Sequence, residues 1–171
     1  MPTSTKEDPE LVAAAAGVSR TTVYRHFRSI TGLLDAVAAD LLSRARFDEL
    51  LAAVSLPEPV AALAEVTRLG CGIWAIDPDL VRNLLALARA QADAVPVIDQ
   101  LEADRVQVME YLVQRLDESG ALAAGLSRRD AVDLLVAATG FAGWDQIVTA
   151  RRRSPATATS LIVRLALRAV T

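Results

Sequence analysis

The chain has 171 residues, 53% of them hydrophobic and 4% aromatic, which is enough for one compact body with a small appended module. Its formal net charge of −3 excludes a uniformly basic nucleic-acid binder but not a local basic patch. We expect no membrane span, because the longest uncharged stretch, residues 134–144, is much shorter than the roughly 20 apolar residues required. The polar and acidic residues 1–10 and the single Cys71, which cannot form an internal disulfide, favour a cytoplasmic protein.

Helix signals dominate the whole chain, and alternation of apolar and polar residues with a period of two is absent, which predicts an all-α fold. We expect helices near residues 8–16, 19–27, 31–52, 58–76, 78–93, 95–119, 127–152 and 155–170. Capping residues ahead of a proline mark starts at Asp8-Pro9, Asp77-Pro78 and Ser154-Pro155. A variant capping box at residues 127–130 marks another start, and the break at residues 57–59 separates the front of the chain from the rest.

The front of the chain predicts two short helices joined by a sharp turn. Gly17 supplies the backbone freedom that ends the first helix, and Ser19 caps the second. Val23 and Phe27 lie four residues apart and form the buried stripe of the second helix. The residues left wholly or partly outside are Arg20, Thr21, Thr22, Tyr24, Arg25 and His26. Hydroxyl groups and a helix N-terminus suit phosphate, arginine can pair with guanine and threonine methyl groups can contact thymine, so this face is typical of a DNA-recognition helix.

The pattern Ala-Gly-Val-Ser-x-x-x-Val-Tyr-x-His-Phe, followed by Ser-x-x-x-Leu-Leu, resembles the helix-turn-helix of TetR/AcrR-type repressors over about residues 8–34. The resemblance implies a helix-turn-helix DNA-binding head with its connecting helix in residues 1–48, and a ligand-binding and dimerisation body in residues 49–171. It also implies a homodimeric one-component regulator that binds palindromic operator DNA until a small-molecule inducer releases it. The resemblance implies that four residues contact base edges or nearby phosphates: Ser19, Arg20, Thr21 and Thr22. It implies that Tyr24 and His26 contact the DNA backbone. Arg25 and Arg28 complete the expected DNA-binding set.

The front of the chain departs from the family pattern at three points. The family places an amphipathic helix ahead of the Asp8 helix, where this chain has residues 1–7, so we expect a head that is incomplete at its N-terminus. Asp8 stands where the family often has threonine, and Ile30 where it usually has lysine, a role for which Arg28 could substitute. Two functions stay open: the operator-binding repressor, and a ligand-binding or protein-interaction dimer whose truncated head no longer binds DNA.

Soft, aromatic and charged side chains on the body helices predict a ligand pocket. Arg105 interrupts the apolar stripe of the helix near 95–119, so its guanidinium needs a carboxylate on a small molecule or on Asp145, or else reaches water. The candidate lining residues are Cys71, Trp74, Arg105, Met109, Phe141, Trp144 and Asp145. The alternative is that these residues form ordinary core.

The last two helices predict a dimer interface. Residues 131–144 are apolar nearly all round, small residues there allow close backbone approach, and the final helix offers a second apolar face. We expect an isologous four-helix seam, the alternative being a buried central helix in a monomer. Its predicted members are Ala137, Ala138, Gly140, Phe141, Gly143, Leu161, Ile162 and Leu165. The arginines at residues 151–153 are expected to form a solvated helix end.

The residue inventory argues against an enzyme. The single His26 lies in the predicted DNA helix, and Cys71 has no sequence-visible histidine partner. Metal-ligand spacing, a phosphate-binding glycine loop and a nucleophile motif are missing from the sequence. We therefore expect no catalysis, no cofactor and no metal.

Overall fold

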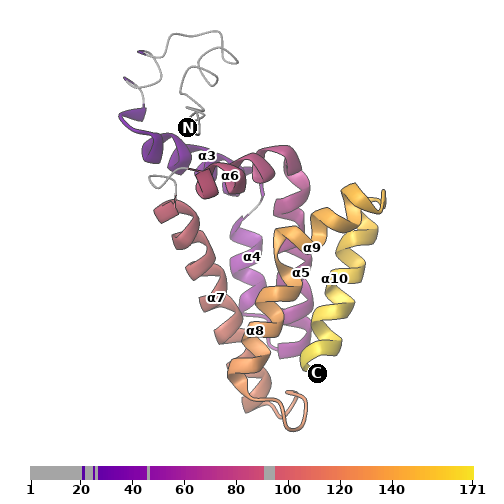
Figure 1. Cartoon of the computed structure of the whole chain (residues 1–171). Coiled ribbons are helices and arrows are strands. Elements are labelled where there is room, and N and C mark those ends of the chain that lie inside the picture. The colour runs from indigo at the N-terminus through magenta and orange to yellow at the C-terminus, as the bar shows by residue number, and fades with distance from the viewer. Residues whose placement is uncertain (1–20, 22–24, 26, 46, 91–94) are drawn as a thin grey trace, which may run out of the picture.

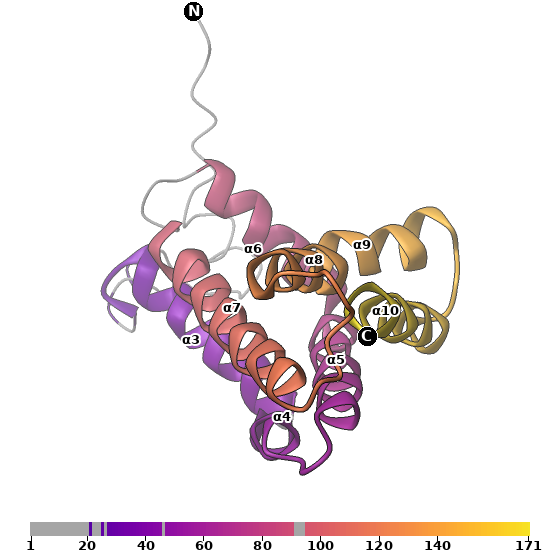
Figure 2. The same ribbon diagram turned by 90° about the horizontal axis from the view of Figure 1, so that it is seen from below.

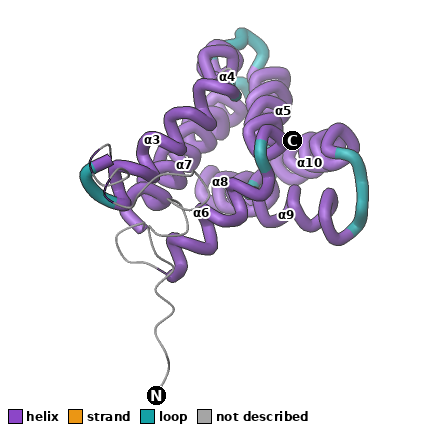
Figure 3. Tube along the Cα trace, turned by 90° about the horizontal axis from the view of Figure 1, so that it is seen from above, coloured by secondary structure: helices purple, strands orange, loops and turns teal. Residues whose placement is uncertain are grey.

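The computed structural model describes residues 21, 25, 27–45, 47–90 and 95–171, and these residues form helices and connecting loops without a strand (Figures 1 and 3). The helices are α3 (Ile30–Arg44), α4 (Phe47–Val54), α5 (Pro59–Ile76), α6 (Pro78–Ala90), α7 (Val95–Glu118), α8 (Arg128–Thr139), α9 (Phe141–Asp145), the π-helical turn η2 (Gln146–Ala150) and α10 (Pro155–Val170). The all-α prediction is confirmed. The helix predicted near 8–16 and most of the one near 19–27 lie outside the described residues.

Capping groups begin the body helices where the sequence places them. Asp77 Oδ1 accepts a hydrogen bond from the backbone N–H of Leu80 at 3.0 Å, and Ser154 Oγ accepts one from Thr157 at 3.2 Å. Ser127 Oγ accepts from the Asp130 N–H at 3.1 Å and donates to the carboxylate of the same residue at 2.7 Å. This reciprocal pair is the predicted variant capping box. Each cap satisfies an N–H group that the first helical turn leaves without a partner.

The helix predicted over residues 31–52 is wrong as a single element, because the chain divides it into α3 and α4. The Ala45 N–H donates to both Leu41 O and Leu42 O, which closes the last turn of α3. The new direction lets α4 bury Leu50 and Ala53 while it packs beside α5. Burial of this apolar face explains the break, which no proline or glycine marks in the sequence.

The helix predicted over residues 127–152 is also interrupted. Gly140 takes an extended conformation with φ −67° and ψ 154°, which ends α8, and the following α9 runs into η2. A break frees carbonyl groups of the preceding turn, and side chains from two other helices bind them. Arg105 donates to Val136 O at 3.0 Å, and Trp74 Nε1 donates to Thr139 O at 3.3 Å. Tertiary contacts therefore stabilise the interruption.

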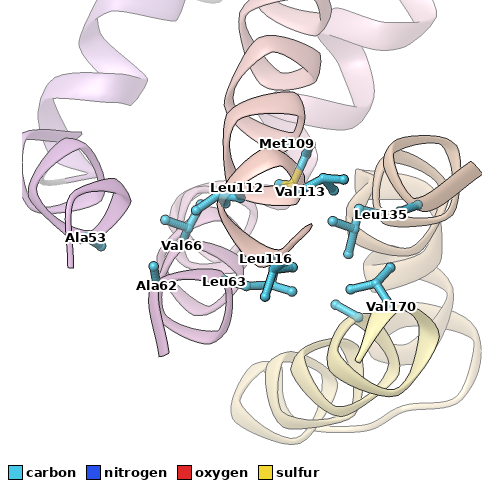
Figure 4. Close-up of a cluster of buried hydrophobic side chains, with 12 residues drawn as sticks. Ala53, Ala62, Leu63, Val66, Met109, Leu112, Val113, Leu116, Leu135 and Val170 are labelled. Atoms are coloured by element: carbon cyan, nitrogen blue, oxygen red, sulfur yellow. The ribbon is translucent and has the colours of Figure 1, made fainter. Parts of the chain in front are cut away.

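The main core lies where α5, α7, α8 and α10 meet. Leu63 of α5, Leu112 and Leu116 of α7, Leu135 of α8 and Val170 of α10 are fully buried. Figure 4 shows these side chains projecting from the four helices into one shared interior. Burying a leucine side chain contributes about 1.5 to 3 kcal/mol, so this cluster is the principal source of stability.

A second buried cluster joins α5 to α9 and α10. It contains Cys71, Phe141, Trp144 and Ile162, with the Phe141 ring edge-on to Trp74 at 5.8 Å between centroids. Figures 1 and 2 both place α10 on the side of the body away from α3. Helix α5 contacts α4, α7 and α10, so it is the central element of the body.

The connection between α7 and α8 contains two glycines in the left-handed backbone region. Gly120 and Gly125 have φ values of +72° and +81°, a region that glycine adopts without steric penalty. In the connection to α10, Arg152 also has a positive φ of 52°. Arg151, Arg152 and Arg153 are all exposed, as expected for a solvated helix end.

Two helical stretches, Pro59–Ile76 and Arg128–Ala150, are long and apolar enough by length and composition to cross a membrane. In each, 28% of the apolar window is buried within the chain. Core helices of soluble proteins pass the same test, so this finding is weak support for a span, and the expectation that the chain has none stays a prediction.

Candidate functional site

The predicted DNA-contacting set is described only in part. Ser19, Arg20, Thr22, Tyr24 and His26 lie outside the described residues. Thr21 and Arg25 are helical and exposed, and Arg28 is exposed with a positive φ of 60°. Their roles toward DNA stay predictions.

A compact joint connects this segment to α3. The Ser29 N–H donates to Phe27 O at 2.7 Å, and Ser29 Oγ caps α3 by accepting from the Gly32 N–H at 3.0 Å. A Cβ atom on Gly32 would lie 2.2 Å from Phe27 O, which is a backbone clash. Any side chain at this position would therefore force the backbone of the joint to shift.

A cavity of about 190 Å³ lies inside the body, between α3, α4, α5, α6, α7 and the last turn of α8. Its wall is largely apolar. Leu41 and Leu42 of α3, Phe47 of α4, Ile73 of α5 and Val108 of α7 are examples. Cavities of this kind bind small molecules when a few polar groups fix the orientation of the ligand.

The cavity brings together four of the seven residues predicted to form a pocket. Cys71, Trp74, Arg105 and Met109 line it. The other three were wrongly grouped with them. Phe141 and Trp144 pack in the second core cluster behind Trp74, and Asp145 lies in an ion pair on α9. Ligand binding by the four lining residues stays a prediction.

Arg105 pairs within its own helix and with α8, and the proposed pairing with Asp145 is wrong. Its Nε and Nη2 atoms donate to Glu102 Oε2 at 3.1 and 2.6 Å. Its Nη1 atom donates to Val136 O at 3.0 Å and to Thr139 Oγ1 at 3.1 Å. The side chain is 18% exposed. Its charge is thus compensated, and its position is fixed at the α8 break.

Asp145 binds Arg82 of α6 instead. The Arg82 Nη2 atom donates to Asp145 Oδ1 at 2.6 Å, and Thr149 Oγ1 donates to the same oxygen at 2.8 Å. The hydrogen bond from Arg82 lowers the pKa of the Asp145 carboxyl, against the opposing effect of burial. This ion pair connects α6 to the end of α9. The sequence did not predict it, because the two residues lie far apart along the chain.

The polar groups on the cavity wall differ in whether they have partners. Thr67 is 2% exposed, and its Oγ1 atom has no hydrogen-bond partner. Burial raises the pKa of the Cys71 thiol to about 11, so the thiol stays protonated at neutral pH and is a poor nucleophile. Among the described residues, no group of three or more His, Cys, Asp or Glu side chains could hold a metal ion.

Sequence reasoning missed Thr67 and Gly70 as wall residues. Both lie on α5 at helical spacing from Cys71 and Trp74, so that all four share one face. That spacing could have identified Thr67 and Gly70 as wall residues from the sequence. The contributions of α3 and α4 had no comparable signal, because they depend on how these helices fold against α5 and α7.

The predicted dimer residues fall into three groups by their exposure. Leu165 is 52% exposed and Ala137 is exposed, whereas Ala138, Gly140, Gly143 and Leu161 are half-buried. Phe141 and Ile162 are 7% and 3% exposed and belong to the chain's own core, so their placement on an outer face was wrong. Leu134, 42% exposed on α8, was not in the predicted set.

A comparison with protein families finds a match at the front of the chain. Residues 10–37 match the family model of bacterial regulatory proteins of the tetR family. The matched segment contains the predicted recognition helix and the start of α3. No curated protein and no solved structure matches the chain. The match supports a TetR-family regulator with a helix-turn-helix segment at its front, and the all-helical architecture of the described residues agrees with it.

Proposed function

We propose that this protein is a homodimeric repressor that binds a palindromic operator and is released from it by a small-molecule inducer. The observation that supports this proposal is the position of α3, between the DNA-binding segment and the cavity. The family match ends at residue 37, and the next turns of the same helix place Ala38, Leu41 and Leu42 on the cavity wall. A molecule in the cavity therefore touches the helix that continues directly from the DNA-binding segment.

The joint at the start of α3 supplies the mechanical link. Because Ser29 and Gly32 fix the chain tightly at that point, a displacement of α3 is carried into the preceding segment. An inducer acts by binding more tightly to the protein with its heads in the released arrangement than in the DNA-bound one. The coupling is reciprocal, so operator DNA must weaken inducer binding by the same factor.

Exposed apolar side chains on α8 and α10 support dimerisation. Leu134 and Ala137 are exposed on α8 and Leu165 on α10, and these two helices pack against each other. A second copy related by a two-fold axis would cover both faces in a four-helix seam. Sedimentation at micromolar concentration should give a dimer, and Leu165→Glu should shift it toward monomer. A monomeric unaltered chain would contradict this part of the proposal.

DNA binding is tested by selection from random duplexes, followed by mobility-shift assays at fixed salt. We expect a palindromic sequence to be enriched. Arg25→Ala and Arg28→Ala should each weaken its binding, and a matched substitution of the distant, exposed Arg164 should not. If no sequence is enriched although the protein sediments as a dimer, the repressor function fails and the ligand-binding dimer without DNA affinity becomes the better account.

A further inference from the structure

The size of the internal cavity limits what can occupy it. Its volume is about 190 Å³. An engineered cavity of about 150 Å³ lined by leucine, isoleucine and phenylalanine, in another protein, stays dry and binds benzene. Because protein interiors pack densely, the present cavity suits a molecule of about one to two rings, on the order of ten non-hydrogen atoms.

Two charged side chains line the described cavity wall: Arg105, whose charge is compensated by Glu102, and Asp104, which is exposed. Arg105 donates through Nε, Nη1 and Nη2 to Glu102, Val136 and Thr139. Asp104 accepts a hydrogen bond from Gln100 at 2.8 Å. An anion entering the cavity would lose its hydration and would have to displace a partner of Arg105 to regain a charged contact.

Most uncharged polar groups of the wall already have hydrogen-bond partners and are not available to a ligand. Trp74 Nε1 donates to Thr139 O, and Thr139 Oγ1 donates to Leu135 O at 2.7 Å while it accepts from Arg105. Within the described part of the wall, the buried oxygen without a partner is the hydroxyl of Thr67. The buried part of the described wall therefore offers one side-chain oxygen without a partner and no free cationic group.

We propose that the ligand of this cavity is an uncharged, mostly hydrocarbon molecule of one to two rings with at most one hydrogen-bonding group. The inference deepens the proposed regulator function and rests on it for its biological role. Carboxylated and phosphorylated compounds are excluded as inducers by the same argument, since each would place an unpaired negative charge among Leu41, Ile73 and Val108.

Two glycines of α5 provide matched variants. Gly70 lines the cavity, Gly72 is exposed, and an added Cβ atom meets nothing within 4 Å at either position. Gly70→Leu fills the cavity, whereas Gly72→Leu adds the same side chain to the surface of the same helix. Both changes raise helix propensity, so that effect cancels in the comparison.

The test is isothermal titration calorimetry without DNA, using indole as the neutral probe and benzoate as an anion with the same number of non-hydrogen atoms. We expect indole to bind the unaltered chain and Gly72→Leu equally, and Gly70→Leu at least about tenfold more weakly. Benzoate should bind the unaltered chain at least about tenfold more weakly than indole. The charge comparison needs no variant, so it stands whether or not Gly70→Leu folds.

The proposal is overturned if benzoate matches or exceeds indole, if Gly70→Leu binds indole as the unaltered chain does, or if indole does not bind. Because DNA is absent from this titration, failure of operator binding leaves its result intact. Conversely, a positive titration combined with no enriched DNA sequence would overturn the repressor function alone.

Discussion

Replacing Arg105 by methionine should destabilise the protein through the α8 break. The substitution keeps much of the apolar stem but removes the bonds to Val136 O and Thr139 Oγ1. Thr139 keeps its bond to Leu135 O, whereas the Val136 carbonyl is left without its side-chain donor. A hydrogen bond from a charged donor contributes about 1.5 to 3 kcal/mol, and an unsatisfied buried carbonyl costs about 1 to 3 kcal/mol. We expect a loss of about 2 to 3 kcal/mol in the free energy of unfolding.

Arg68 supplies the matched control. It also donates through Nε and Nη2 to a glutamate three residues earlier, at 2.8 and 2.5 Å, but its side chain is 54% exposed and bonds to α8 are not among its contacts in the described chain. An exposed pair of this kind contributes about 0.5 kcal/mol or less, so Arg68→Met should be nearly neutral. The difference between the two variants isolates the contacts of Arg105 with α8.

Urea denaturation followed by circular dichroism at one fixed protein concentration measures both variants, since a dimer's stability depends on concentration. With a slope of about 2 kcal/mol per molar urea, Arg105→Met should lower the midpoint by about 1 M relative to Arg68→Met. Equal midpoints for the two variants would refute the argument that Arg105 stabilises the interruption of α8.

Three further outcomes follow from single contacts. Thr67→Val removes a buried hydroxyl that has no partner, so it should raise the free energy of unfolding by about 1 kcal/mol, and a decrease would contradict the assignment. The folded-state pKa of Asp145 lies below its unfolded value, so the pair with Arg82 stabilises the fold fully above the unfolded pKa and loses this effect as pH falls through the folded pKa. The stability difference between the unaltered chain and Asp145→Asn should therefore shrink on acidification from neutral pH, and a constant difference would count against the pair. Gly32→Ala should weaken operator binding by about tenfold, because the added Cβ collides with Phe27 O at the joint. Indole binding in calorimetry should stay unchanged, because the cavity is left intact. Unchanged operator binding would show that the joint does not link α3 to the DNA-binding segment.

Local chemistry made much of the body predictable. Caps at Asp77, Ser127 and Ser154 mark real helix starts because each side chain binds N–H groups within three residues of itself. These features depend on residues adjacent in sequence.

The unpredicted features all depend on distant partners. The break at Gly140 is stabilised by Arg105 and Trp74, which lie on other helices. The pairing of Asp145 with Arg82 spans 63 positions, and no periodicity in the sequence indicates it. Composition alone suggested Asp145 as the partner of Arg105, and only the fold shows that each has a different one.

The sequence predicted only some of the residues that line the candidate pocket, because the selection was based on residue type. Cys71 and Trp74 were chosen as soft or aromatic side chains, a criterion that also selected Trp144, which is core. A criterion based on the shared α5 face would have added Thr67 and Gly70 and left Trp144 out.

The central claim, that an occupant of the cavity controls DNA binding through α3, is tested most directly by fluorescence anisotropy on a labelled, selected operator. Saturating indole should lower operator affinity by about tenfold for the unaltered chain and for Gly72→Leu, while operator binding by Gly70→Leu does not respond to indole. Operator affinity that stays the same when calorimetry shows the cavity to be filled would contradict the claim.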